Sequence, residues 1–147
     1  MLGRHRVGRL GSVVVLCGGL AASTSAAVVD PPLIAAVKRQ DAEAVKRLLD
    51  DGFDVDARQP DGATALHHAA HRDDLDAVQL LIEAGATVGT ANDLGATPLW
   101  LAAMNGSASM VARLLDAGAD VHAALTMGET PLMTAARSGS AEGVRRL

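Results

Sequence analysis

Aromatic residues are almost missing from this chain of 147 residues, which has one Trp, one Phe and no Tyr. Aromatic side chains supply much of the buried area in an ordinary globular core. Thin helices that pack through alanine and leucine do not need them. The composition, 49% hydrophobic but only 1% aromatic, therefore favours packed thin helices over one large core.

Cysteine and positive charge are also scarce. Because Cys17 is the one cysteine, the chain can form no internal disulfide and no zinc site built on several thiolates. Without the three arginines among the first ten residues, ten basic residues face 17 acidic ones, a balance of −7. Nucleic acid calls for a cationic surface, so we expect no nucleic-acid partner.

Catalytic motifs are missing as well. No nucleophile and base stand at a plausible spacing, and no glycine-rich segment followed by Lys-Ser/Thr could hold a phosphate. We therefore expect a protein without enzymatic activity and without a cofactor.

Residues 1–27 have the three parts of a secretory signal peptide: a basic start, an uncharged apolar stretch and a run of small residues. Two alternatives stay open. Residues 10–29 are long enough to remain as an uncleaved membrane anchor, and Cys17 could carry a lipid, by resemblance to a lipoprotein leader. Each alternative places the rest of the chain across the membrane, because the arginines stay on the cytoplasmic side.

One block of sequence recurs at a fixed spacing. It reads Gly-Ala-Thr-Ala-Leu-His-His-Ala-Ala from Gly62, Gly-Ala-Thr-Pro-Leu-Trp-Leu-Ala-Ala from Gly95 and Gly-Glu-Thr-Pro-Leu-Met-Thr-Ala-Ala from Gly128, so the copies are 33 residues apart. A period of this length indicates stacked supersecondary units. The blocks resemble the ankyrin repeat over roughly residues 31–147. The resemblance implies an all-α solenoid of stacked helix–turn–helix units with short hairpin-like turns between them.

The resemblance divides the chain after its leader into four units. They are a degenerate capping repeat at 28–59, full repeats at 60–92 and 93–125, and a truncated repeat at 126–147. In the first unit, we expect Asp30 to cap a helix with proline in its first turn. In the last, the second helix would start near Ser140 and span about two turns, too few to be stable alone. We interpret this end as a truncated reading frame, a fragment or an edge that a partner completes.

The resemblance also implies where a protein partner would bind: a concave groove lined by the inner helices, and the turns that project from its edge. Carried over by position, the binding residues are Pro60, Asp61, Ala63, His71, Arg72, Asp93, Leu94, Ala96, Met104, Asn105, Thr126, Met127, Glu129, Arg137 and Ser138. Among them Leu94, Met104 and Met127 would expose apolar groups. Such clusters often mark protein contacts, although scattered apolar residues are also ordinary surface.

Three histidines form the only cluster with metal-ligand chemistry. His67 and His71 would share a helix face and could bind zinc or copper, but a metalloprotease would need glutamate where His68 stands. By resemblance, His67 is instead the histidine whose ring bonds across the turn, which leaves His68 and His71 at the surface. We favour this interpretation and keep metal binding as an alternative.

Trp100 stands where His67 stands one repeat earlier. The substitution removes the imidazole contact and adds a large ring. We expect the ring to pack and to fill space beside Met133, because it follows the core Leu99 on a helix of small residues. The alternative is an anchor for a partner in the groove, since tryptophan is favoured in binding hot spots.

These observations predict a non-enzymatic protein–protein interaction module, similar to bacterial ankyrin-repeat proteins that are exported to the periplasm or secreted. Its partner would be another protein, bound through the groove and the turns. The membrane would be contacted only through residues 10–29, if they are uncleaved. Two alternatives remain: a metal-binding protein that uses the histidine cluster, and a fragment of a longer structural repeat array.

Overall fold

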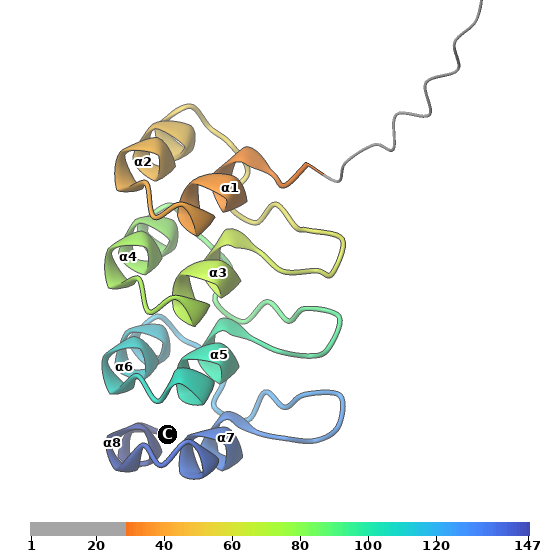
Figure 1. Cartoon of the computed structure of the whole chain (residues 1–147), viewed down its shortest axis with the longest axis vertical. Coiled ribbons are helices and arrows are strands. Elements are labelled where there is room, and N and C mark those ends of the chain that lie inside the picture. The colour runs from red at the N-terminus through yellow and green to blue at the C-terminus, as the bar shows by residue number, and fades with distance from the viewer. Residues whose placement is uncertain (1–28) are drawn as a thin grey trace, which may run out of the picture.

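The structure is a computed structural model that describes residues 29–147 (Figure 1). The predicted leader and Cys17 lie outside the described residues, as does the predicted anchor except for Val29. The described part forms the helices α1 (Pro32–Lys38), α2 (Ala42–Asp50), α3 (Ala65–His71), α4 (Leu75–Glu83), α5 (Pro98–Asn105), α6 (Ala108–Asp116), α7 (Pro131–Arg137) and α8 (Ala141–Arg146). None of them combines the length and the hydrophobicity of a membrane span.

The helices are arranged in pairs, and the pairs are stacked in one direction (Figure 1). α1, α3, α5 and α7 form an inner row beside three long loops, and α2, α4, α6 and α8 form an outer row. Helices of one row pack on one another, as α3 does on α5 and α5 on α7. Residues 29–147 contain no strand, so the predicted all-α solenoid is confirmed. One pair of helices falls in each predicted unit.

The short helices begin where the sequence supplies caps. In each outer helix a side chain accepts a hydrogen bond from the backbone N–H three residues later; the caps are Asp41, Asp74, Ser107 and Ser140. In α5 and α7, a threonine cap is followed by proline at the first helical position, where its missing N–H costs nothing.

The start of α1 differs from the prediction. Asp30 does not cap it: the cap position is Pro31, which makes no side-chain hydrogen bond. Because the helix begins at Pro32, Asp30 lies one residue too early to reach the free N–H groups of the first turn. Its carboxylate instead accepts from Lys38 Nζ at 2.8 Å and from the side-chain amide of Gln59.

The core is a ladder of equivalent residues through the stack. Leu33, Leu66 and Leu99 hold the same position in successive inner helices, and at most 1% of each is exposed. The outer helices add a buried ladder of valines: Val45, Val78 and Val111. Full burial of a leucine contributes about 1.5–3 kcal/mol, and here the neighbouring pair provides the cover. Leu132, the last leucine of the ladder, is 45% exposed.

Three loops connect the pairs, and we call residues 53–63, 86–96 and 119–129 hairpins 1, 2 and 3. Hydrogen bonds join each hairpin to the next: the Asp93 N–H donates to the Asp61 carbonyl at 2.9 Å, and the Thr126 N–H to the Leu94 carbonyl at 3.1 Å. Gly95, with φ +82°, permits this approach, since a Cβ there would lie 2.9 Å from the Thr126 nitrogen. The hairpins therefore form one connected row.

Candidate protein-binding surface

The inner helices and the hairpins enclose a shallow hollow of about 200 Å³. Its lining comes from hairpins 1 and 2, from α3 and from α5, and consists of Asp61, Ala63, His67, His68, His71, Asn92 and Leu101. The hollow thus lies where the inner row meets the hairpins, on the side of the stack that the sequence predicted to bind a partner (Figure 1).

Most of the predicted binding residues are exposed. They are Pro60, Asp61, His71, Arg72, Asp93, Leu94, Met104, Asn105, Thr126, Met127, Arg137 and Ser138. Glu129 is half-buried. Ala63 and Ala96 are buried, with 5% and 4% exposed, because their backbone groups close the hairpins. These two alanines offer a partner little surface.

Two of the exposed residues also hold neighbouring repeats together. The side-chain amide of Asn105 donates to the backbone carbonyls of Ala70 and His71, at 3.3 and 2.6 Å. The Ser138 hydroxyl donates to the Ala103 carbonyl at 3.2 Å. Asn105 and Ser138 are equivalent positions one repeat apart, so this position belongs partly to the frame of the stack.

Hairpin 3 is held in a similar way. The Thr126 hydroxyl donates to the Leu94 carbonyl at 3.3 Å. The Glu129 carboxylate accepts from the Thr134 hydroxyl at 2.7 Å and forms an ion pair with Arg137. These contacts fix the backbone of the hairpin on α7 and leave its tip free.

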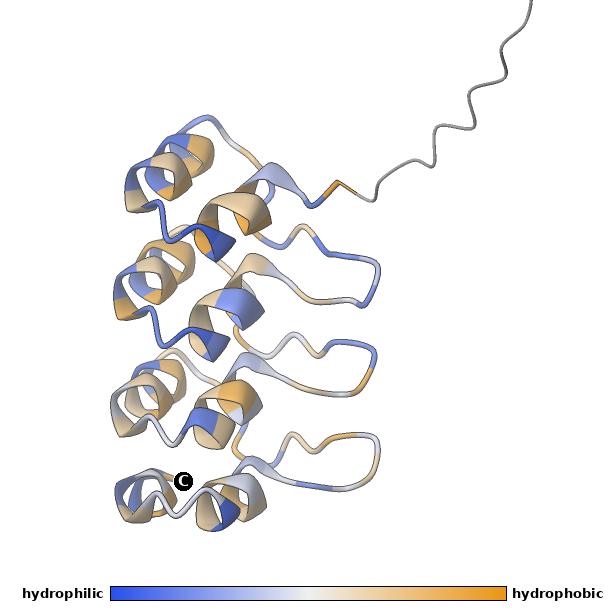
Figure 2. Ribbon diagram, viewed as in Figure 1, coloured by the Kyte–Doolittle hydropathy of each residue, from blue (hydrophilic) through white to orange (hydrophobic). Residues whose placement is uncertain are grey.

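The side chains that remain free differ along the row. Hairpin 1 presents Asp61, whereas the equivalent residue of hairpin 2 is Leu94, which is 68% exposed. Met127, in hairpin 3, is 93% exposed, and Met104, at the end of α5, is 37% exposed. In Figure 2 the tip of the first hairpin is blue, whereas the other two hairpins carry orange stretches beside their remaining blue ones. Apolar contact area therefore collects at repeats 93–125 and 126–147.

His67 helps to hold its turn and the next repeat in place. The Thr64 N–H donates to its Nδ1 at 3.1 Å, so Nδ1 carries no proton. Its Nε2–H therefore donates to the Ala96 carbonyl, at 3.0 Å, in the next repeat. Burial lowers the pKa of His67, which favours this neutral ring. The ring thus bonds across the turn, as the resemblance implied, and both of its nitrogens are used.

His68 is half-buried rather than a free surface residue, and it belongs to a network that the sequence analysis missed. Its Nε2 donates to the side-chain carbonyl of Gln59, whose amide nitrogen donates to Asp30. Lys38 pairs with the same carboxylate and lowers the pKa of Asp30. The network joins the start of the first repeat to α3. Burial, with the positive charge of Lys38, lowers the pKa of His68 to about 4.

The three histidines do not form a metal site in this arrangement. His67 bonds to the Ala96 carbonyl, His68 bonds to Gln59, and His71 is exposed at the end of α3. Within residues 29–147, no three His, Cys, Asp or Glu side chains are placed to hold a metal ion. The geometry gives the metal-binding alternative no support.

A family model describes the same architecture. The family model described as ankyrin repeats (3 copies) matches residues 16–92, 33–124 and 88–147. The chain belongs to the ankyrin-repeat family. Among curated proteins, no relative matches it. Ankyrin repeats are generally protein–protein interaction modules and typically are not enzymes.

Trp100 takes the histidine position of the third ankyrin repeat and cannot perform the same task. An indole has one N–H donor and no acceptor, so it offers nothing to the N–H of the threonine cap. The ring is partly buried, and its nitrogen is fully buried without a hydrogen-bond partner in the described chain. Packing of the ring beside Met133 stays a prediction, and burial of the nitrogen comes at the cost of an unsatisfied donor.

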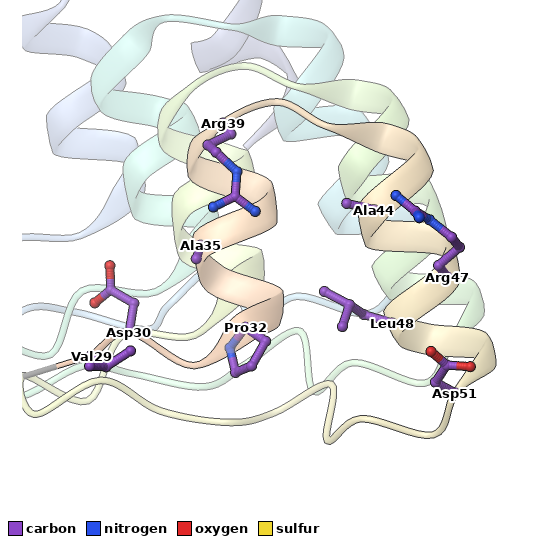
Figure 3. Close-up of a pocket in the computed structure, with 9 residues that line it drawn as sticks. All are labelled: Val29, Asp30, Pro32, Ala35, Arg39, Ala44, Arg47, Leu48 and Asp51. Carbon is purple, nitrogen blue, oxygen red and sulfur yellow. The ribbon is translucent and has the colours of Figure 1, made fainter.

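Of the two ends of the ankyrin stack, the last repeat was interpreted as a possible edge that a partner completes, and the first repeat was not predicted as a site. At the first repeat, a hollow of about 490 Å³ lies between α1 and α2 (Figure 3), lined by Val29, Asp30, Pro32, Ala35, Arg39, Ala44, Arg47, Leu48 and Asp51. At the last repeat, Leu132 and Met133 are 45% and 59% exposed. The 33-residue spacing could have identified Leu132, because the equivalent leucines of the other repeats are buried in the core.

Proposed function

We propose that this ankyrin-repeat chain binds another protein through the tips of hairpins 2 and 3 and the adjoining ends of the inner helices. The observation that carries the proposal is the exposure of Leu94 and Met127, 68% and 93%, on hairpins whose backbones are fixed by hydrogen bonds to their neighbours. Exposed apolar groups on a fixed frame favour a protein partner, because little ordering entropy opposes binding. Methionine adapts to irregular partner surfaces.

The polar side of the same surface would set the orientation of the partner. Asp61 and Asp93 place carboxylates on hairpins 1 and 2, and His71 and Arg72 lie exposed at the end of α3. A partner with an apolar segment at one end and a polar or basic segment at the other fits this distribution. Rim charges of this kind mainly affect the rate and specificity of association.

The binding test is a pull-down with the full chain from the cell-envelope fraction, in which a Leu94→Glu/Met127→Glu variant is compared with wild type. The matched control is Met133→Glu, which places the same charge on an exposed apolar residue away from the hairpin tips. We expect the double variant to lose the partners that the control retains. If both retain the same partners, the surface is assigned wrongly.

We also propose that the chain acts outside the cytoplasm, in the periplasm or as a secreted protein. Support comes from the basic, apolar and small-residue segments of residues 1–27. Cell fractionation with mass spectrometry of the N-terminus tests this proposal. A chain that starts at Ala27 or Val28 in the periplasm supports it, and an uncleaved chain in the membrane fraction supports the anchor over residues 10–29. An unprocessed chain in the cytoplasm contradicts both.

A further inference from the structure

The two end faces of the stack carry opposite halves of the contact that joins neighbouring repeats. We call the outer side of the first repeat the N-face; its apolar residues are Pro32, Ala35, Ala44 and Leu48. The C-face is the outer side of the last repeat, where Leu132 and Met133 protrude and Val144 and Leu147 are partly exposed.

Residues equivalent to the N-face are covered inside the stack. Ala44 and Leu48 are partly exposed, but the residues 33 positions later, Ala77 and Leu81, are 3% and 0% exposed. The preceding repeat covers them there. The hollow of about 490 Å³ at the N-face is therefore equivalent to a surface that the preceding repeat covers inside the stack (Figure 3).

Residues equivalent to the C-face are covered by the following repeat. Leu132 and Met133 are 45% and 59% exposed, whereas Leu66 and His67, at the same positions of the second repeat, are 1% and 2% exposed. In the inner repeats this pair of side chains packs under the next inner helix, as α3 does against α5. The C-face thus presents two protruding apolar side chains and the N-face an apolar hollow.

We propose that the C-face of one copy of this chain docks on the N-face of a second copy, in the register that neighbouring repeats use within the stack. The contact goes beyond the proposed function, since it uses the ends of the stack and leaves the hairpin tips free. Because the two faces differ, each docked pair keeps one free face of each kind. The association is therefore head-to-tail and open-ended.

Two hydrogen bonds between neighbouring repeats indicate how polar residues at the edge of the contact between copies would affect association. Asn105 donates to the Ala70 and His71 carbonyls of the preceding repeat. The equivalent N-face residue is Arg39, which also carries N–H donors, and the equivalent carbonyls are those of Ala136 and Arg137 at the end of α7. This substitution keeps a donor where the repeat contact has one.

The second polar contact works against association. Arg113 donates to the side-chain carbonyl of Gln79 in the preceding repeat. Between copies the equivalent residues are Arg47 and Arg145, so two positive charges meet. A contact the size of one repeat interface, with like charges at its rim, predicts weak and concentration-dependent association that salt strengthens.

The test is sedimentation equilibrium of the full chain as purified, with its N-terminus read by mass spectrometry, from about 10 µM to about 1 mM because contacts of this size are weak. Ala35→Glu blocks the N-face and Met133→Glu the C-face. Both should fold: Leu101 shows that the Ala35 position accepts a larger side chain, and Met133 is 59% exposed. Met127→Glu, at a hairpin tip, is the matched control.

We expect the wild type and Met127→Glu to form concentration-dependent oligomers and each end-face variant to stay monomeric alone. In an equal mixture, the intact C-face of Ala35→Glu should dock on the intact N-face of Met133→Glu. The dimer should not grow further, because both of its outer faces carry a blocking glutamate. A monomeric wild type over the whole range would overturn the proposal. So would association that Met133→Glu abolishes and Ala35→Glu does not, which indicates two C-faces in contact.

Arg145→Gln tests the register. It recreates the acceptor that Gln79 offers to Arg113, so we expect association about two- to fivefold tighter than wild type. Arg146→Gln removes the same charge at a neighbouring exposed position and is the matched control. Equal effects of the two substitutions would overturn the proposed register.

Discussion

Repeats 60–92 and 93–125 fold into the same pair of helices and the same hairpin, although they differ at most positions that face the groove. Repeat 93–125 has Leu94, Trp100, Leu101 and Met104 where repeat 60–92 has Asp61, His67, His68 and His71. What the two repeats share is their leucines, their small residues, and the threonine and glycine at the same positions. The frame therefore depends on few residues, and the others are free to change the chemistry of the surface.

The replacements change how each repeat is joined to its neighbours. In the second repeat, His67 bonds to the next repeat and His68 bonds through Gln59 to the previous one. In the third repeat, Leu101 has no polar group and the Trp100 N–H has no partner within the described residues, so the contacts of His67 and His68 have no counterpart there. The second repeat is thus held by polar contacts that the third repeat lacks.

The largest expected effect comes from removing the polar contact of His67. His67→Ala leaves the Thr64 N–H and the Ala96 carbonyl without their partner and opens a cavity between two repeats. We expect the free energy of unfolding to fall by about 2–4 kcal/mol, measured by urea denaturation at pH 7. His71→Ala, on the same helix but exposed, should change it by less than about 0.5 kcal/mol. Equal losses for the two variants would contradict the role of His67.

The stack itself could be predicted from the sequence, because its determinants are local and repeat in phase. The caps of the outer helices, the proline at the start of α5 and the core leucines can each be identified within a few residues. The position and the contact of His67 were available through the resemblance to ankyrin repeats. The caps and the core leucines recur in phase from unit to unit, so a short stretch of sequence is enough to assign them.

The rest depends on residues that are distant in the sequence. Asp30 looked like a helix cap, but the helix begins one residue too late for it, and its carboxylate bonds to Gln59, 29 residues away. Asn105 and Ser138 hold positions that vary in the family pattern, yet their side chains bond to the preceding repeat. Which variable side chains are free for a partner follows only from these contacts between repeats.

A smaller effect is expected from His68, which titrates, whereas its equivalent Leu101 does not. The pKa of His68 is about 4 in the folded chain against an ordinary 6.5, so between these values the unfolded chain binds more protons. Stability is therefore highest above about pH 6.5 and falls as the pH is lowered toward 4. We expect a loss of about 1–2 kcal/mol across this window, allowing for solvent screening at a half-buried ring.

His68→Leu gives the second repeat the residue of the third and tests this dependence. In urea denaturation, the free energy of unfolding should differ less between pH 7 and pH 5 for the variant than for wild type. Part of the difference should remain, because burial also lowers the pKa of His67. His71→Leu, at an exposed histidine, should keep the whole wild-type difference. If His68→Leu leaves the difference between pH 7 and pH 5 unchanged, the pH dependence of stability does not come from His68.

The smallest effect is expected at Trp100, where the third repeat carries a buried indole nitrogen without a partner. Trp100→Phe removes this N–H and keeps most of the ring, so the gain from losing an unsatisfied donor opposes the loss of some apolar area. We expect the free energy of unfolding to stay within about 0.5 kcal/mol of wild type, whereas Trp100→Ala should lower it by about 3 kcal/mol. A loss above about 1.5 kcal/mol for Trp100→Phe would indicate that the indole N–H is bonded after all. The histidine position of the third repeat would then be as polar as that of the second.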